Sequence, residues 1–423
     1  MPTAPIFHLV LVILHCCISI VTSSSDGTAT TLTSHQISAV YHNEHLLRVA
    51  LGVEDYRQGS LSNVLDDTLF PRPSRLHRRS NVVASRHHVE YPVNVHIADD
   101  GSNTMYVASF RANQVFRISS DGKPELFARG TYCNTRSPCT VLSGPWGLVT
   151  HQDKLYVSSF STDQILIFNT ETSQYVDVMG CSEELNAPEG LSIGPSGKYL
   201  YVASFLSGEI VRYSIQERKK VNVVASSLPG PEGISFLTGS SSTLLAVACH
   251  TDHSIRLIDV GIEALVQLIE VQIAEVDMDG EEVLRLTSSS GSSSESSSGS
   301  SSGSSSGNGG SWSHPVGVSA SRLNGKDILF LGGHSTIDNK SDVLVAFEIK
   351  RPNCTFQQHN SSCTEVTLAA MWHAGMPELK GPSGIAISGD SIFVASYQSH
   401  RILAYEMNET LEEKLKLKAS IRL

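Results

Sequence analysis

Imidazole and carboxylate side chains recur at fixed positions of a repeated pattern in this chain. His250 and His334 each end a short apolar segment, where the other copies of that segment end in Phe or Tyr. Glu189 and Glu232 each stand in the middle of a Pro-Glu-Gly triplet. Histidine and glutamate carry much of the proton transfer of enzymes near neutral pH, and both are common ligands of divalent cations. The chemistry expected of these residues is therefore acid–base or metal-assisted catalysis.

These residues form two overlapping expected sets. The expected catalytic residues are Glu232, His250 and His334. The expected ligands of a divalent metal, zinc, calcium or magnesium, are Glu189, Glu232, His250, His334 and His314, which directly precedes Pro315. Structural roles are the alternative. A histidine can fill an aromatic position as a hydrogen-bonded core residue, and the glutamates can accept backbone N–H groups where a strand begins.

The elements that must position these side chains are short repeated segments. A proline, any residue, a glycine and an aliphatic residue occur in this order five times, starting at Pro145, Pro188, Pro231, Pro315 and Pro382. A segment of the type Tyr-Val-Ala-Ser-Phe has six copies, ending at Phe110, Phe160, Phe205, His250, His334 and Tyr397. The first copy opens with a degenerate motif, Pro92-Val93-Asn94-Val95. A period of about 43 residues indicates stacked copies of one small unit.

Each unit contains about three or four short runs rich in β-branched and aromatic residues and bounded by Gly, Asn, Asp and Ser, which is typical of β-strands. A small antiparallel sheet cannot bury both of its faces alone, so neighbouring sheets must pack radially on one another. Small residues between the aromatic ends of the second segment let adjacent sheets approach closely. We therefore predict an all-β fold, a six-bladed β-propeller over residues 81–423.

The Pro-x-Gly-aliphatic motif followed by Tyr-Val-Ala/Ser-Ser-Phe resembles NHL-type repeats, roughly over residues 81–423. Streptogramin (virginiamycin B) lyases, gluconolactonase-like and strictosidine synthase-like proteins and peptidylamidoglycolate lyases share the six-bladed shape. Propeller enzymes work on the face where the innermost strand begins and the second strand ends. The resemblance to the lyases implies a metal held by His and Glu of neighbouring blades. Gluconolactonase-like relatives hold calcium with a tunnel carboxylate, and Asn94 and Asn186 are near the corresponding edge here.

These observations favour two functions. The first is a scaffold that binds a protein, peptide, glycan or small-molecule ligand at the propeller face. The second is a metal-dependent lyase or lactone hydrolase with its site at the mouth of the central tunnel. A net charge of −11 argues against nucleic acids and acidic membranes as partners. The sequence has no G-x-S-x-G elbow, phosphate loop, paired-cysteine zinc signature or Rossmann fingerprint in a convincing context.

Residues 1–23 are expected to be a secretory signal peptide. Their apolar run, Ile6–Val21, is shorter than the roughly 20 residues of a membrane-spanning helix. Residues 24–80 carry no copy of the repeat and form an N-terminal extension. Residues 288–311 are almost pure Ser and Gly, which predicts a flexible insertion within the propeller. The expected protein is secreted and has no membrane span after cleavage.

Sequons and cysteines agree with secretion. The sequons for N-glycosylation are at Asn339, Asn353, Asn360 and Asn408. Cys133 with Cys139, and Cys354 with Cys363, each bracket a short polar loop that a disulfide could close. Cys181 and Cys249 are left over. The last blade is completed either by residues 81–85 or by the stretch that begins at Leu415, and the sequence leaves this choice open.

Overall fold

The computed structural model describes secondary structure for residues 8–14, 17–23, 29–31, 91–119, 122–133, 139–238, 243–261, 264–276, 282–290, 314–323, 325–334, 342–350, 365–373, 379–406 and 416–422. The chain divides into two compact units, residues 1–81 and residues 82–423. The expected glycosylation sites Asn339, Asn353, Asn360 and Asn408, and the pair Cys354 and Cys363, lie outside the described residues.

The first unit contains a small antiparallel sheet. Its strands are β1 (His8–Leu14), β2 (Cys17–Ser23) and β3 (Ala29–Thr31), in that order. The expected signal peptide includes β1 and β2, and its cleavage stays a prediction. Among the described residues, no helix is long and apolar enough to cross a membrane.

The second unit consists of antiparallel sheets, and we call each sheet a blade. Blade 1 contains β4 (Pro92–Ile97), β5 (Met105–Ser109), β6 (Gln114–Ile118), β7 (Pro124–Tyr132) and β8 (Thr140–Leu142). Blade 2 contains β9 (Pro145–His151), β10 (Lys154–Ser159), β11 (Gln164–Asn169) and β12 (Tyr175–Met179). Blade 3 contains β13 (Pro188–Ile193), β14 (Tyr199–Ser204), β15 (Glu209–Ser214) and β16 (Lys219–Ala225).

The C-terminal half of this unit repeats the arrangement. Blade 4 contains β17 (Pro231–Phe236), β18 (Leu244–Cys249), β19 (Ser254–Asp259), β20 (Ala264–Val276) and β21 (Glu282–Ser290). Blade 5 contains β22 (His314–Leu323), β23 (Lys326–His334), β24 (Val343–Lys350) and β25 (Glu365–His373). Blade 6 contains β26 (Pro382–Ser388), β27 (Ser391–Ser396), β28 (Arg401–Glu406) and β29 (Lys416–Arg422). The expected Ser/Gly insertion overlaps the end of β21, and residues 291–311 lie outside the described residues.

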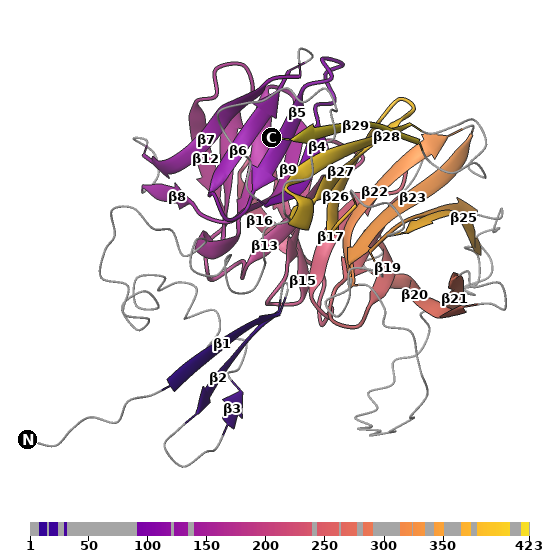
Figure 1. The fold of residues 1–423 in the computed structure, drawn as a ribbon. Coiled ribbons are helices and arrows are strands. Elements are labelled where there is room, and N and C mark those ends of the chain that lie inside the picture. Colours follow the sequence, from indigo (N-terminus) through magenta and orange to yellow (C-terminus); the bar gives the residue numbers. More distant parts are fainter. Residues whose placement is uncertain are drawn as a thin grey trace, which may run out of the picture. The chain divides into compact units, whose positions relative to one another are not determined.

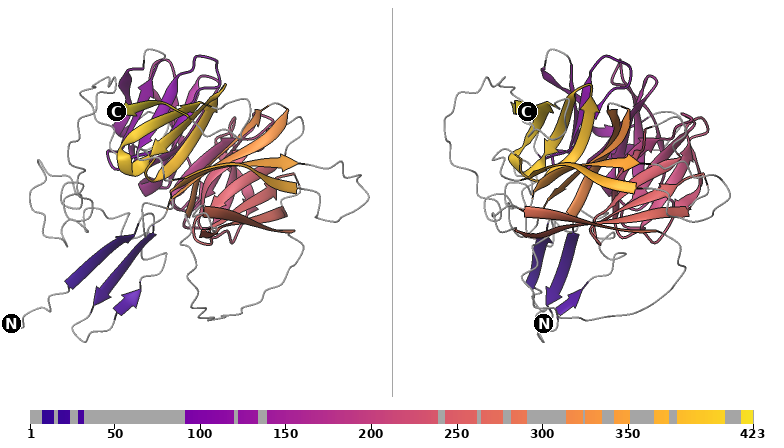
Figure 2. Two further views of the ribbon diagram at one scale, coloured as in Figure 1. Left: turned by 45° about the vertical axis from the view of Figure 1, so that its right-hand side comes forward. Right: turned by 90° about the vertical axis from the view of Figure 1, so that its right-hand side faces the viewer.

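The first strands of the blades form a closed ring. In the described part of residues 82–423, β4 contacts β9, β9 contacts β13, β13 contacts β17, β17 contacts β22, β22 contacts β26, and β26 contacts β4 again. Figures 1 and 2 show these sheets fanning outward from their first strands. The predicted all-β propeller is confirmed by this sheet order.

Among the described residues, no strand is shared between the two ends of the ring. β29 pairs with β28 as the outermost strand of blade 6, so the C-terminal stretch completes that sheet. β4 packs directly against β26, β27 and β28. The competing residues 81–85 lie outside the described residues. In the described part of the chain, the two end blades are joined by these contacts of β4 with blade 6.

The glycine of each Pro-x-Gly segment is required by the close approach of neighbouring blades. A Cβ atom at Gly190 would overlap the carbonyl oxygen of Glu232 in the next blade. The overlap with a carbonyl oxygen recurs for Gly147 with Glu189, Gly233 with Val316, and Gly317 with Ser383, and a Cβ atom at Gly384 would overlap the Cα atom of Asn94. The pairing register also shifts within these segments, as a β-bulge does. The motif thus sets the spacing of the blades.

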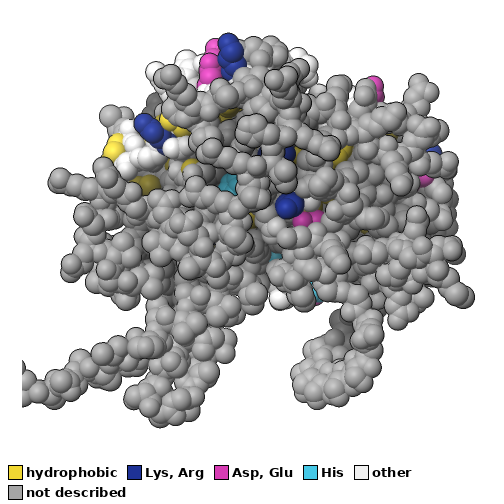
Figure 3. Space-filling model, viewed as in Figure 1, with side chains coloured by type: hydrophobic (Ala, Val, Ile, Leu, Met, Phe, Trp, Pro, Cys, Tyr) yellow, Lys and Arg dark blue, Asp and Glu magenta, His cyan; other side chains and the backbone are white. Residues whose placement is uncertain are grey.

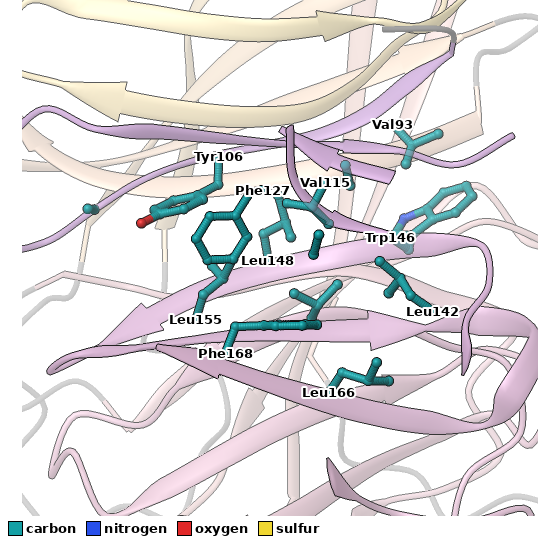
Figure 4. Packing of buried hydrophobic residues seen from close by; sticks show 14 of the residues in the cluster. Val93, Tyr106, Val115, Phe127, Leu142, Trp146, Leu148, Leu155, Leu166 and Phe168 are labelled. Carbon is teal, nitrogen blue, oxygen red and sulfur yellow. The ribbon is translucent and has the colours of Figure 1, made fainter. Parts of the chain in front are cut away.

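Aromatic and aliphatic side chains fill the spaces between blades. Figure 4 shows the core between blades 1 and 2, where the rings of Tyr106 and Phe127 lie close to Phe168. The ring centroids of Phe127 and Tyr106 are 5.1 Å apart in an edge-on arrangement. Burying each such side chain stabilises the fold by about 1.5–3 kcal/mol. The predicted bulk at the ends of the second segment serves this packing.

The disulfide predicted between Cys133 and Cys139 is present. It lies between β7 and β8, whose pairing adds a fifth strand to blade 1. Blade 4 likewise has a fifth strand, because β20 and β21 form a long hairpin. Two of the described blades therefore exceed the expected three or four strands. Cys181 is exposed and Cys249 is buried, both as free thiols.

Candidate functional site

The Pro-x-Gly segments and the ends of the second strands lie along one edge of the ring. Pro188 pairs with Ser204, and Pro231 pairs with Cys249, so each Pro-x-Gly segment lies beside the last residues of the second strand. We call this edge of the six blades the Pro-x-Gly face. All of the expected site residues belong to it by their strand positions.

Glu232 of β17 and His250, which directly follows β18, are in contact on this face. Glu232 Oε2 lies 3.1 Å from His250 Nδ1, and the two side chains are 0% and 1% exposed. Burial raises the pKa of Glu232, and the hydrogen bond and charge of His250 act in the opposite direction. With Glu232 ionised, Nδ1 donates to the carboxylate, and the lone pair of a neutral imidazole then lies on Nε2. This geometry is the one that orients a histidine as a base or a ligand.

The Glu232 carboxylate is incompletely satisfied. Oε1 is buried and has no hydrogen-bond partner among the described residues. A buried carboxylate oxygen without a partner is costly, and a cation or a donor group would remove that cost. Glu232 and His250 supply two metal ligands, whereas protein metal sites commonly use three or four. A metal would need further ligands from neighbouring blades.

His314 and His334 occupy suitable backbone positions in blade 5. The two residues are direct partners in the register of β22 and β23. β22 contacts both β17 and β18, which carry or precede the Glu232–His250 pair. The side chains of His314 and His334 lie outside the description. Among described side chains, no group of three His, Cys, Asp or Glu could hold a metal. The metal set stays a prediction.

Glu189 has a different environment from Glu232, although the two occupy equivalent positions. Phe205 of blade 3 stands where blade 4 has His250, so Glu189 has no imidazole at that position of its own blade. Its side chain is buried, and its carbonyl oxygen accepts a hydrogen bond from Ser158 Oγ at 2.7 Å. The Glu–His contact is therefore specific to blade 4 among these two blades.

Trp146 occupies the same position in blade 2. Its ring packs edge-on against Phe110 at 5.2 Å between centroids and lies 6.3 Å from Phe160. Figure 4 shows the Trp146 side chain beyond the end of the Leu148 strand segment, near Val93. Trp146 also lines the central channel, so it closes part of the wall with an aromatic surface.

A central channel of about 360 Å³ runs along the first strands of all six blades. Aliphatic residues such as Leu148, Leu191 and Ile234 lie along it but are more than 90% buried, so the surface that is open in the channel is mostly polar. Its polar side chains are His96, Asp99, Asn94 and serines that include Ser192, Ser235 and Ser319. Glu189, Glu232 and His250 are buried and are not among its lining residues.

His96 is a wall residue that the sequence prediction missed. Its Nε2 accepts the backbone N–H of Thr150 in blade 2 at 2.9 Å and lies 2.8 Å from Thr150 Oγ1. Burial lowers the pKa of His96 to about 4, so the imidazole is neutral at physiological pH. In blade 4, Ser235 Oγ accepts Ala320 N–H at 3.0 Å in the same manner. The sequence contains a signal for this role, because His96 and Ser235 are each the fifth residue of the segment that begins with the proline of the repeat.

A second set of polar residues joins neighbouring blades. A side chain in the turn after the second strand accepts the N–H of the residue that precedes the next blade's proline. The pairs are Asn113 with Gly144 (2.7 Å), Asp163 with Ala187 (2.8 Å), Asp342 with Gly381 (2.9 Å) and His400 with Tyr91 (3.1 Å). His253 occupies the corresponding turn position of blade 4. These side chains have structural roles, and they explain several polar residues of the Pro-x-Gly face.

The described surface has no patch of one charge in the view of Figure 3. Its Lys and Arg side chains are few and mostly lie near Asp or Glu side chains. Ion pairs among the described residues include Arg117 with Glu125 and Lys326 with Glu348, at 3.0 Å each.

Comparison with known proteins gives structural likeness only. No family model and no curated protein matches the sequence. Similar structures include hydrazine synthase from Kuenenia stuttgartiensis, with 13% identity, coverage of 78% of this chain and 80% of that chain, and a TM-score of 0.47. A catalytically inactive virginiamycin B lyase from Staphylococcus aureus with quinupristin has 14% identity, 79% and 85% coverage, and a TM-score of 0.45. The β-propeller domain of Cps50 (Swd1) from Myceliophteria thermophila has 11% identity, 82% and 90% coverage, and a TM-score of 0.48. The expected resemblance to propellers of the streptogramin lyase group is confirmed at the level of the fold.

Proposed function

We propose that this chain is a secreted β-propeller that binds a ligand, with the Pro-x-Gly face and the central channel as its binding region. The supporting observation is the channel of about 360 Å³, whose open surface is mostly polar and includes serine hydroxyls from several blades. Ligand sites commonly have a volume of about 300–1,000 Å³ and a few polar groups that converge on the ligand. The residues most suited to chemistry, Glu232 and His250, are buried away from the wall.

A binding screen tests this function. The secreted, folded protein is immobilised and probed with glycan, peptide and small-molecule arrays. The expected result is a retained ligand with a Kd below about 1 mM, which corresponds to a binding free energy of about −4 kcal/mol. Absence of any retained ligand below that concentration would remove the support for a binding scaffold.

Secretion is part of the proposal. The apolar run Ile6–Val21 and the sequon at Asn339 support a secretory route, and the disulfide between Cys133 and Cys139 fits an oxidising compartment. Expression in a secreting cell line should release a protein whose first residue lies near Ser24 and whose mobility increases after removal of N-glycans. Retention of the uncleaved chain inside the cell would contradict this part.

A second function is favoured by one specific observation, the buried contact between Glu232 and His250 at 3.1 Å. It supports a metal-dependent lyase or lactone hydrolase in which His314 and His334 supply further ligands. The purified protein should then contain near-stoichiometric zinc, calcium or magnesium, and His250→Phe together with His334→Phe should lose that metal while the fold is retained. A metal-free protein whose thermal stability is unchanged by chelators would exclude this function and leave the binding function in place.

A further inference from the structure

The central channel has a polar level formed by one position of the repeat. This position is the fifth residue counted from the proline that begins the first strand of each blade. The residues at this position all line the channel: His96, Val149, Ser192, Ser235, Ser319 and Ala386. The three serines come from blades 3, 4 and 5, so their hydroxyl groups form an arc on one side of the wall. His96 of blade 1 contributes an imidazole at the same level.

Two of these hydroxyl groups are available to a ligand. Ser235 Oγ is occupied by the N–H of Ala320. Ser192 and Ser319, in contrast, have side-chain hydroxyls with no hydrogen-bond partner among the described residues, and both residues are partly exposed to the channel. A hydroxyl group both donates and accepts a hydrogen bond. Groups of the same kind on a ligand, hydroxyls above all, would match them.

The channel wall is unfavourable for a negatively charged ligand. Among the described residues, no Lys or Arg lines the channel, and His96 is neutral at physiological pH because burial lowers its pKa to about 4. Asp99 is an acidic residue of this described wall. Burial and neighbouring Asp100 raise its pKa, and His151 acts in the opposite direction. An anion would lose its hydration without a compensating positive charge. An uncharged ligand avoids this cost.

The aliphatic residues along the channel contribute little open surface. Leu148, Leu191, Ile234 and Ile385 line the channel, but each is more than 90% buried in the packing between blades, and Trp146 is 7% exposed. The surface open to a ligand is therefore mostly polar, which suits a ligand rich in hydroxyl groups. A volume of about 360 Å³ is near the lower end of the range of ligand pockets.

We propose that the central channel binds an uncharged polyhydroxylated small molecule, a neutral sugar of one or two rings, through the hydroxyl groups of Ser192 and Ser319 and the mostly polar wall around them. This inference rests on the proposed binding function and specifies its ligand class and its subsite.

The first test is a comparison of probes by saturation-transfer NMR and calorimetry on the secreted protein. The neutral probes are methyl β-glucoside, methyl β-galactoside, methyl α-mannoside, N-acetylglucosamine, cellobiose and lactose. The charged analogues are glucuronate and glucosamine. At least one neutral probe should bind with a millimolar or tighter Kd, and its charged analogue should bind at least about tenfold more weakly. Equal or tighter binding of glucuronate, or no binding of any neutral probe, overturns the ligand class.

The second test locates the site. Ser192→Ala and Ser319→Ala should each weaken binding of the neutral probe by about two- to tenfold, the value of one hydrogen bond. Ser319→Phe should abolish binding because its ring fills the channel. Ser226→Ala is the matched control, since Ser226 is exposed and lies outside the channel wall. Binding that survives Ser319→Phe in a folded protein overturns the channel as the site.

A failure of the sugar proposal can be distinguished from a failure of the proposed binding function. A ligand of another class that the array detects, and whose binding Ser319→Phe abolishes, leaves the binding function intact and rejects the sugar. An array ligand that binds equally to Ser319→Phe rejects the channel subsite alone. An empty array together with silent sugar probes rejects both proposals.

Discussion

His400 Nδ1 accepts the backbone N–H of Tyr91 at 3.1 Å, and this hydrogen bond joins the last blade of the propeller to the first. The two rings lie edge to face with centroids 4.3 Å apart, and the guanidinium of Arg111 lies 4.1 Å from the centre of the Tyr91 ring. Ser383 Oγ supplies a second link by donating to the carbonyl oxygen of Val93 at 2.7 Å. These contacts join the two end blades in the described part of the chain.

The His400 contact can be tested by replacing His400 with glycine or with asparagine. His400→Gly should destabilise the propeller by about 1 kcal/mol, because it removes the acceptor for Tyr91 N–H. Glycine adopts the left-handed backbone of this position, φ 55°, without strain, so the loss reports the hydrogen bond. Urea unfolding monitored by circular dichroism provides the measurement.

His400→Asn is the matched control for that variant. Asn113 holds the corresponding position of blade 1 and accepts Gly144 N–H at 2.7 Å. Asparagine should therefore retain most of the stability of the parent protein. Equal losses for Gly and Asn would show that the imidazole stabilises the ring through its packing on Tyr91 instead.

His96 should make the propeller sensitive to acid. Its pKa is about 4 in the folded protein, against a reference value of 6.5 for the unfolded chain. Between these values the unfolded state binds the proton first, so the free energy of unfolding falls as the pH is lowered from 6.5 to 4 and is unaffected by this group above 6.5. The loss is about 2 kcal/mol for a partly exposed side chain. Urea unfolding at several pH values measures it.

His96→Gln should reduce that pH dependence, because glutamine offers an acceptor oxygen to Thr150 N–H and does not titrate. Carboxylates titrate in the same range in both proteins, so the difference between the two curves isolates His96. His151→Gln, a substitution one residue after Thr150, serves as the control. A parent and a His96→Gln protein with identical pH curves would contradict the assignment.

The repeat made most of the fold predictable from the sequence. A fixed spacing of Pro-x-Gly segments and alternating apolar runs can be read locally, and stacking of identical units leaves few alternative arrangements. The Glu232–His250 contact was also foreseeable, because antiparallel pairing places the start of one strand beside the end of the next. The fifth strands of blades 1 and 4 were not, since hairpin extensions break the repeat.

The channel wall was predicted less well because it depends on which side of each strand faces the axis. The register shifts within the Pro-x-Gly segment, as at a bulge, which changes that alternation, and Glu189 and Glu232 are not among the residues that line the channel. His96 then emerges as a wall residue, although its copy of the motif is degenerate. Side-chain direction at a bulge is a property of three-dimensional register and not of local composition.

Gly190 offers a test of the blade spacing. Gly190→Ala should destabilise the protein by about 3 kcal/mol or more, because its Cβ atom would overlap the backbone carbonyl of Glu232, which cannot move without displacing blade 4. Gly101→Ala is the comparison: Gly101 has a φ of 76° and no atom near its Cβ position, so strain alone should cost about 1 kcal/mol. Similar losses at both sites, measured by thermal unfolding, would contradict the close approach.

The buried pair in blade 4 should show strong coupling in a double-mutant cycle. His250→Phe leaves the Glu232 carboxylate buried without its partner, and Glu232→Val leaves the imidazole in the same state, so each single change should cost about 2–4 kcal/mol. The double variant recreates the combination of blade 1, where Val93 and Phe110 occupy these positions. It should regain most of the lost stability, with a coupling energy of about 2 kcal/mol or more in the unfolding free energies. Additive losses would show that Glu232 and His250 stabilise the fold independently. The interaction between the two side chains would then contribute no stability to the protein without a bound ligand or metal.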